Sequence, residues 1–149
     1  MTDTASTAPA SDDGARAAGL RLPSELVDLL RGTATCYLAT VMPDGSPQLT
    51  QTWVDTDGAD VLINTVTGHR KTRNVRGDPR VSLVVSSPAR PSRYAEIRGL
   101  VTAMTTEGAE EHIEALAQRY LGRPYPWYGG RHERRVVLRI SPRKITTMG

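Results

Sequence analysis

Five basic residues and one acidic residue lie between two apolar, strand-like runs at 61–63 and 81–85. The basic residues are Arg70, Lys71, Arg73, Arg76 and Arg80. A short helix is expected over residues 70–76, because Gly77 can end it and Pro79 stops any continuation. Its first turn would present free backbone N–H groups beside Arg70 and Lys71, and both side chains can bind phosphate. The pattern therefore predicts a phosphate clamp.

Charge alone leaves two other interpretations of this segment open. A run of Lys and Arg on a short helix is often a solvated surface face, and it can also bind a nucleic acid backbone. The tight placement between two strands favours a small-molecule phosphate over nucleic acid.

Residues 68–80, which read GHRKTRNVRGDPR, resemble the signature of the pyridoxamine 5′-phosphate oxidase-like split β-barrel proteins. They are most similar to the actinobacterial branch of deazaflavin-dependent, or F420-dependent, oxidoreductases. Residues 38–40 (LAT), 44–48 (DGSPQ) and 52–54 (TWV) agree, and the resemblance runs from about residue 22 to the C-terminus. It implies a mainly β fold, a six-stranded antiparallel split β-barrel with two to three flanking helices. It also implies a homodimer with cofactor sites across the interface.

The resemblance further implies which residues bind the cofactor. The strand that flanks the ring carries Gln48, Thr50, Gln51, Thr52 and Trp53. The phosphate region carries Thr65, Arg70 and Lys71, with Asn74 as a supporting contact. From the residues alone, the first group also fits a polar, solvent-facing strand, and Trp53 also fits a dimer contact.

Composition sets the broad class of the protein. A chain of 149 residues with 38% hydrophobic and 23% charged residues suits one soluble globular domain with a real core. The formal net charge of +3 favours anionic ligands. The single cysteine, Cys36, excludes an internal disulfide, and its apolar surroundings predict a buried structural thiol.

The N-terminal residues 1–20 are poor in large apolar side chains, so a disordered tail is expected there, followed by one barrel domain over 21–149. No signal peptide and no apolar stretch long enough to span a bilayer is found, which predicts a cytoplasmic protein.

Hydrophobic periodicity predicts the order of the elements. Helices are expected over 22–30 and 107–121, besides the basic one. Six strands are expected, over 33–42, 47–55, 60–65, 81–87, 94–104 and 135–147. The first three should form an antiparallel meander, a Pro-rich loop should span 88–92, and Gly99 should mark a bulge or bend. This order fits a small closed barrel.

The chain lacks the sequence motifs of several kinds of site. The three histidines are scattered and have no cysteine partners, so no metal site is expected. The chain has no nucleophile elbow, no G-x-G-x-x-G fingerprint and no Walker loop. What remains is the binding of a phosphorylated organic cofactor that carries the chemistry itself.

A late segment, residues 119–131, combines Pro, Gly and aromatic residues, which is typical of a loop. We expect Tyr125, Trp127 or Tyr128 to shape a substrate pocket, although packing over the barrel mouth is an equal alternative.

The resemblance implies an oxidoreductase in which coenzyme F420 exchanges hydride with an unsaturated or conjugated small-molecule acceptor. The basic residues of the 70–76 helix suit the long acidic tail of that coenzyme. The alternatives are an FMN-binding oxidoreductase of the same fold and a non-catalytic flavin- or deazaflavin-binding module. His69 departs from the small or basic residues expected there, and either binds phosphate or caps the helix.

Overall fold

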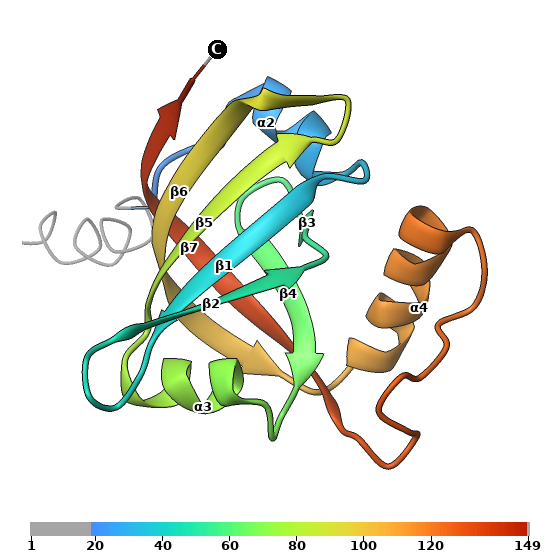
Figure 1. The fold of residues 1–149 in the computed structure, drawn as a ribbon. Coiled ribbons are helices and arrows are strands. Elements are labelled where there is room, and N and C mark those ends of the chain that lie inside the picture. Colours follow the sequence, from blue (N-terminus) through green and yellow to red (C-terminus); the bar gives the residue numbers. More distant parts are fainter. Residues whose placement is uncertain (1–18, 149) are drawn as a thin grey trace, which may run out of the picture.

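The structure of the chain, a computed structural model, describes residues 19–148 (Figure 1). Over these residues the elements in chain order are α2 (Ser24–Leu30), β1 (Thr35–Val41), β2 (Pro47–Thr52), β3 (Asp55–Thr56), β4 (Val61–Val66), α3 (Arg70–Gly77), β5 (Arg80–Ser87), β6 (Arg90–Thr105), α4 (Ala109–Leu121) and β7 (Arg135–Thr147).

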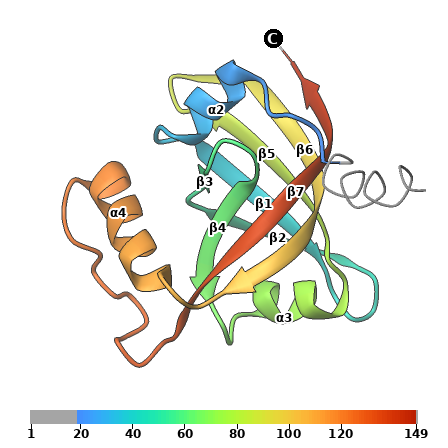
Figure 2. The same ribbon diagram turned by 180° about the vertical axis from the view of Figure 1, so that it is seen from behind.

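The strands form one antiparallel sheet of seven, in the order β2-β1-β5-β6-β7-β4-β3. Two opposite views show this sheet curled into a half-barrel (Figures 1 and 2). The mainly β, split-barrel fold expected from the sequence is confirmed. The six expected strands are present, and the two-residue β3 is a seventh.

The expected meander is wrong, because β2 and β3 lie at opposite edges of the sheet. β2 pairs with β1, whereas β3 pairs with β4, and β4 pairs on its other side with β7. The chain crosses the open side of the half-barrel at Trp53 and Val54, where Val54 is fully buried. Alternation of side chains predicts a strand but says nothing of its partner. The hydrogen-bonded sheet therefore stays open at this side, instead of closing as expected.

Aliphatic side chains fill the interior, as a chain without Phe requires. All six residues of β4 are buried, since one face points into the half-barrel and α4 packs beside the strand. The largest side chains with almost no exposure include Leu30, Leu38, Ile63, Leu83, Ile97, Leu116, Leu138 and Ile140. Full burial of each contributes roughly 1.5–3 kcal/mol of hydrophobic free energy.

The three helices of the described chain occupy three positions around the sheet. α2 and α3 lie at opposite ends of the half-barrel, and α4 stands outside it beside β4 (Figures 1 and 2). Each begins and ends within two residues of its expected bounds. Gly122 ends α4 with a positive φ of 71°, and its N–H donates to the carbonyls of Ala117 and Gln118.

Two local expectations around β6 had different outcomes. The bend at Gly99 is confirmed: the register shifts there, and a Cβ would collide with the carbonyl of Ser141. The Pro-rich loop over 88–92 is wrong. β5 and β6 are joined by a turn at Pro88 and Ala89, and β6 already begins at Arg90. Pro91 is tolerated there because the β5 register is irregular at this end of the strand.

No helix of the described residues is long and apolar enough to cross a membrane. The expected N-terminal tail lies almost wholly outside the residues that the structure describes, and its disorder stays a prediction.

Candidate functional site

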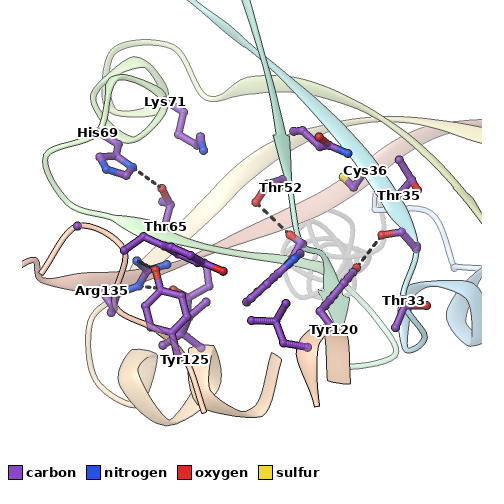
Figure 3. Close-up of a pocket in the computed structure, with 18 of the residues that line it drawn as sticks. Thr33, Thr35, Cys36, Thr52, Thr65, His69, Lys71, Tyr120, Tyr125 and Arg135 are labelled. Carbon is purple, nitrogen blue, oxygen red and sulfur yellow. Dashed lines mark hydrogen bonds between the residues drawn. The ribbon is translucent and has the colours of Figure 1, made fainter. Parts of the chain in front are cut away.

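A cavity of about 880 Å³ opens where the two edges of the half-barrel approach each other. Gln51, Thr52 and Trp53 line it from the end of β2, and Asn64 and Thr65 from the end of β4. The start of β1, the start of α3, helix α4 and the loop before β7 form most of the remaining wall (Figure 3). The opening between β2 and β4 is thus the candidate ligand site.

Positive charge concentrates at the α3 side of the cavity. Lys71 and Arg135 line it, and Glu133 is the only carboxylate among the described lining residues. Lys71 forms no hydrogen bond or ion pair with any residue of 19–148. Burial and the nearby Arg135 guanidinium lower the pKa of Lys71 below its ordinary value. This end of the cavity therefore favours an anion.

Arg135 is buried at the first position of β7, with 7% of its surface exposed. Its Nε donates to Oδ1 of Asn64 at 2.9 Å, and one terminal nitrogen donates to the Tyr125 hydroxyl at 3.2 Å. Its guanidinium also lies over the Tyr125 ring, 5.2 Å from the centroid. None of these partners carries a negative charge, so the charge of Arg135 stays uncompensated inside the protein.

His69 stands at the mouth of the same region. It is the N-cap residue of α3, and its carbonyl accepts hydrogen bonds from the N–H groups of Thr72 and Arg73, both at 3.1 Å. Its ring lies 3.4 Å from the hydroxyl of Thr65 and 3.6 Å from Glu133. The cap role comes from the backbone, which leaves the imidazole free to line the cavity.

Aromatic rings form the opposite wall. Trp53 and Tyr120 are stacked, with centroids 5.1 Å apart and planes 8° apart, and Tyr125 meets Trp53 edge-on at 6.3 Å. The Tyr120 hydroxyl donates to the carbonyl of Ala34 at 2.7 Å and accepts from the N–H of Val54 at 3.3 Å. The stack is therefore pinned to the edge of the sheet and offers a rigid, flat, apolar surface.

The loop after α4 supplies two of the expected aromatic residues to the cavity. Tyr125 and Tyr128 line it, whereas Trp127 packs against Tyr125 without lining it. Glu114 of α4 holds the loop, since its carboxylate accepts from the Tyr125 N–H at 2.9 Å and from the Trp127 indole at 3.3 Å. Trp127 has a φ of 53°, which is rare for a bulky residue and makes this turn a strained one.

Cys36 is buried beneath the cavity, as the sequence predicted. Burial raises the pKa of its thiol to about 12, against a smaller opposing effect of Lys71. The thiol is consequently protonated at neutral pH and is no nucleophile.

Five of the nine predicted cofactor-binding residues line the cavity, and four do not. The five are Gln51, Thr52, Trp53, Thr65 and Lys71. The four outside its lining are Gln48, Thr50, Arg70 and Asn74.

Asn74 acts within the fold, because its Nδ2 donates to Thr40 at 3.0 Å and lies within 3.4 Å of Gln48. Its Oδ1 and the Thr50 hydroxyl are the two buried side-chain polar atoms without a hydrogen-bond partner among the described residues. Leaving such an atom unpaired costs about 1–3 kcal/mol, so an additional polar group would be stabilising at both places.

Sequence reasoning missed Arg135 and Tyr120 as lining residues. Arg135 lies opposite Val66 in the β4–β7 ladder, and Val66 is the last residue of β4 before the turn into α3. The two positions are far apart in sequence, and no local motif joins them. Tyr120 follows the buried Leu116 at helical spacing, a pattern typical of core packing, but its ring reaches the cavity.

Comparisons with known proteins agree with this architecture. The profile of the pyridoxamine 5′-phosphate oxidase family matches residues 22–149. A solved structure described as an F420 reductase is 30% identical, with a TM-score of 0.73, covering 84% of this chain and 98% of that one. A conserved hypothetical protein from Mycobacterium tuberculosis is 27% identical, with a TM-score of 0.67, covering 88% of this chain and 86% of that one.

A further solved structure, a putative pyridoxamine 5′-phosphate oxidase from Listeria innocua, shares the fold at 24% identity and a TM-score of 0.58, covering 76% of this chain and 87% of that one. With the profile spanning nearly the whole described chain, the resemblance stated from the sequence is confirmed. The chain belongs to the pyridoxamine 5′-phosphate oxidase family.

Proposed function

We propose that this protein is an oxidoreductase that uses coenzyme F420 to transfer hydride to an unsaturated or conjugated small-molecule acceptor. The observation that supports it best is the division of the cavity into a cationic end, with Lys71 and Arg135, and an aromatic end, with Trp53 and Tyr120. The similarity to a structure described as an F420 reductase points the same way.

The side chains present fit such a cofactor. A planar ring system suits the flat aromatic wall, and an acidic group suits two cations that no described carboxylate neutralises. Thr52, at the end of β2, the strand that the resemblance assigns to the ring, lines the same cavity. Reduced F420, when bound, would supply a hydride from its deazaflavin ring.

The protein's own residues would bind and orient the cofactor and exclude water from the site. Lys71 and Arg135 would hold the acidic part of the cofactor, and the stacked Trp53 and Tyr120 would fix the position of the ring. Tyr128, on the loop, would shape the entry of the acceptor. No described side chain is required as a proton donor, so solvent is sufficient for that role.

FMN is the second candidate, and one observation favours it. Among the basic residues of α3 only Lys71 lines the cavity, whereas Arg73 and Arg76 are exposed and Arg70 is partly exposed on the outer side. A ligand with a single phosphate needs no more cations than Lys71 and Arg135. The other basic residues of α3, which favoured F420 in the sequence, would contact that coenzyme only if its acidic tail ran along the outer face of α3.

We also propose a homodimer, formed through the outer face of β1, β2 and β5. Tyr37, Leu49 and Val84 are exposed on this face by 43%, 67% and 37%, and the register places Tyr37 opposite Val84. Ala39 lies opposite Leu49 on the same face. An L49E variant should shift the mass in light scattering from dimer to monomer, and an unchanged dimer would reject this face.

The test of the function is a titration of cofactor-free protein with F420 and, separately, with FMN, followed by fluorescence. Turnover with reduced F420 and a panel of quinones and unsaturated carbonyls comes next. Preferential F420 binding with turnover supports the proposal. Preferential FMN binding supports the second candidate, and F420 binding without turnover of any acceptor points to a non-catalytic binding module.

A further inference from the structure

The amide of Asn64 has only one orientation that satisfies its neighbours. It is buried on β4, where its Oδ1 accepts from Nε of Arg135 at 2.9 Å and its Nδ2 donates to the carbonyl of Ala109 at 2.8 Å. A guanidinium can only donate and a carbonyl can only accept, so the reversed amide would place donor against donor and acceptor against acceptor. Arg135 is thus held by the amide oxygen.

The same amide assigns the proton of His112. Nδ1 of His112 lies 3.0 Å from Nδ2 of Asn64, and its Nε2 lies 2.9 Å from the Asp55 carboxylate. Because Nδ2 of Asn64 is a donor, Nδ1 must be the acceptor, and the single ring proton sits on Nε2 and donates to Asp55. Both hydrogens of the Asn64 amide are then used.

Asp55 completes the chain of contacts. Its second oxygen accepts from Arg119 at 2.9 Å, and its side chain is only 14% exposed. The hydrogen-bonded series therefore runs from Arg119, near the C-terminal end of α4, through Asp55, His112 and Asn64 to Arg135 at the wall of the cavity.

We propose that His112 is a positioning residue: through Asn64 it holds the Arg135 guanidinium in the orientation that binds the anionic part of the ligand. This rests on the proposed function, in which Arg135 contacts that part. Without an acceptor at the position of Nδ1, one amide hydrogen of Asn64 would lose its partner, and Nδ2 would be held only by the carbonyl of Ala109. The amide oxygen would then no longer fix the orientation of the Arg135 guanidinium.

A purely structural role for these contacts is the competing explanation, because the series also ties α4 to β3, β4 and β7. The two ring nitrogens separate the roles. Asparagine in place of His112 keeps an acceptor near the position of Nδ1, whereas glutamine keeps a donor near the position of Nε2. H112N therefore preserves the contact to Asn64, and H112Q preserves the contact to Asp55.

The experiment compares H112N and H112Q, with H132Q as a matched control on an exposed histidine outside the series. The dissociation constants for F420 and for inorganic pyrophosphate are measured after circular dichroism has shown both variants to be folded. H112Q should weaken both by about tenfold, the loss of one charge-assisted hydrogen bond, while H112N and H132Q stay within about twofold of the wild type. Equal affinities of H112N and H112Q would overturn the proposal.

A second readout needs no ligand. Burial lowers the pKa of Lys71 most, and the Arg135 guanidinium lowers it further. Displacement of that guanidinium should therefore raise the pKa of Lys71, which NMR of its side chain detects. A rise in H112Q alone supports the positioning role even if F420 does not bind, in which case only the proposed function fails. In the wild type, ¹⁵N shifts should show Nε2 of His112 protonated and Nδ1 bare at neutral pH. The opposite tautomer would overturn the proposal without any variant.

Discussion

Arg135 and Arg139 lie four residues apart on the same face of β7, yet their surroundings differ in kind. Arg139 is half exposed and forms ion pairs with Asp57 and, at 3.3 Å, with Asp60. Arg135 is buried and has only the neutral Asn64 and Tyr125 as partners. A cation with its own carboxylates is satisfied within the fold, whereas a buried cation without one is available to an anionic ligand.

Lys71 belongs with Arg135 in this comparison, and Arg80 belongs with Arg139. Arg80 is paired with Asp78 at 2.6 Å, and that partner raises its pKa. Lys71 has no described partner, and its pKa is lowered. The count of basic residues in this segment therefore overstates how many serve a ligand.

Replacement of Arg135 should give the largest effect. R135M removes a buried, hydrogen-bonded charge, so F420 affinity should fall by about 2–5 kcal/mol, at least about 30-fold. R139M, the matched control on the same strand, should stay within about twofold. Fluorescence titration checks both, and equal losses in the two variants would erase the distinction between them.

Replacement of Asp55 should show what a satisfied carboxylate contributes. D55N breaks the contacts to Arg119 and His112 and should lower the free energy of unfolding by about 2–4 kcal/mol, as measured by urea denaturation.

Although burial opposes ionisation, hydrogen bonds chiefly from His112 hold the pKa of Asp55 below its ordinary value. The stabilisation that ionised Asp55 contributes is thus complete at pH values above its ordinary pKa. It is lost as the pH falls through the lowered pKa of the folded protein. D55N should remove this part of the acid dependence, and D28N, at an exposed position of α2, should leave it intact.

Replacement of Lys71 should give an intermediate effect on binding. K71A should weaken F420 by about tenfold, the contribution of a charge-assisted hydrogen bond. Because the pKa of Lys71 is lowered, its charge is lost as the pH rises through a value below that of an ordinary lysine. Wild-type affinity should accordingly decline on the alkaline side, and K71R should not show this decline. A decline of the same size in K71R would assign it to another group.

Replacement of Tyr128 should give the smallest effect. Its side chain is 69% exposed at the cavity rim, so Y128A should change the free energy of unfolding by less than about 0.5 kcal/mol. The expected change is a severalfold shift in the acceptor's KM, seen in steady-state kinetics with F420 affinity unaltered. Unchanged kinetics would show that this loop residue does not contact the acceptor.

The helical spacing of the α3 residues already predicts which of them face the sheet and which face outward. Arg70, Arg73 and Arg76 repeat at intervals of three and share the outer face, whereas Lys71, Asn74 and Val75 share the face towards the sheet. The predicted phosphate clamp of Arg70 and Lys71 therefore combines residues from both faces. Of these residues of α3, only Lys71, on the inner face, lines the cavity.

Other features could not be predicted from one sequence. The helices and turns follow from local signals such as the Leu stripe of α2 and the glycine after α4. The crossing at Trp53 and Val54 depends on which strand β3 pairs with, and the place of Arg135 depends on the β4–β7 ladder. These are contacts between distant segments, and no periodicity within either segment encodes them.

The most direct test of the account follows the Nε–H NMR signals of Arg135 and Arg139 while F420 is added to the wild-type protein. We predict that the Arg135 signal shifts and saturates with the same dissociation constant as the fluorescence titration, while the Arg139 signal stays in place. Saturable F420 binding that leaves the Arg135 signal unmoved would contradict the central claim that the uncompensated arginine is the anion site.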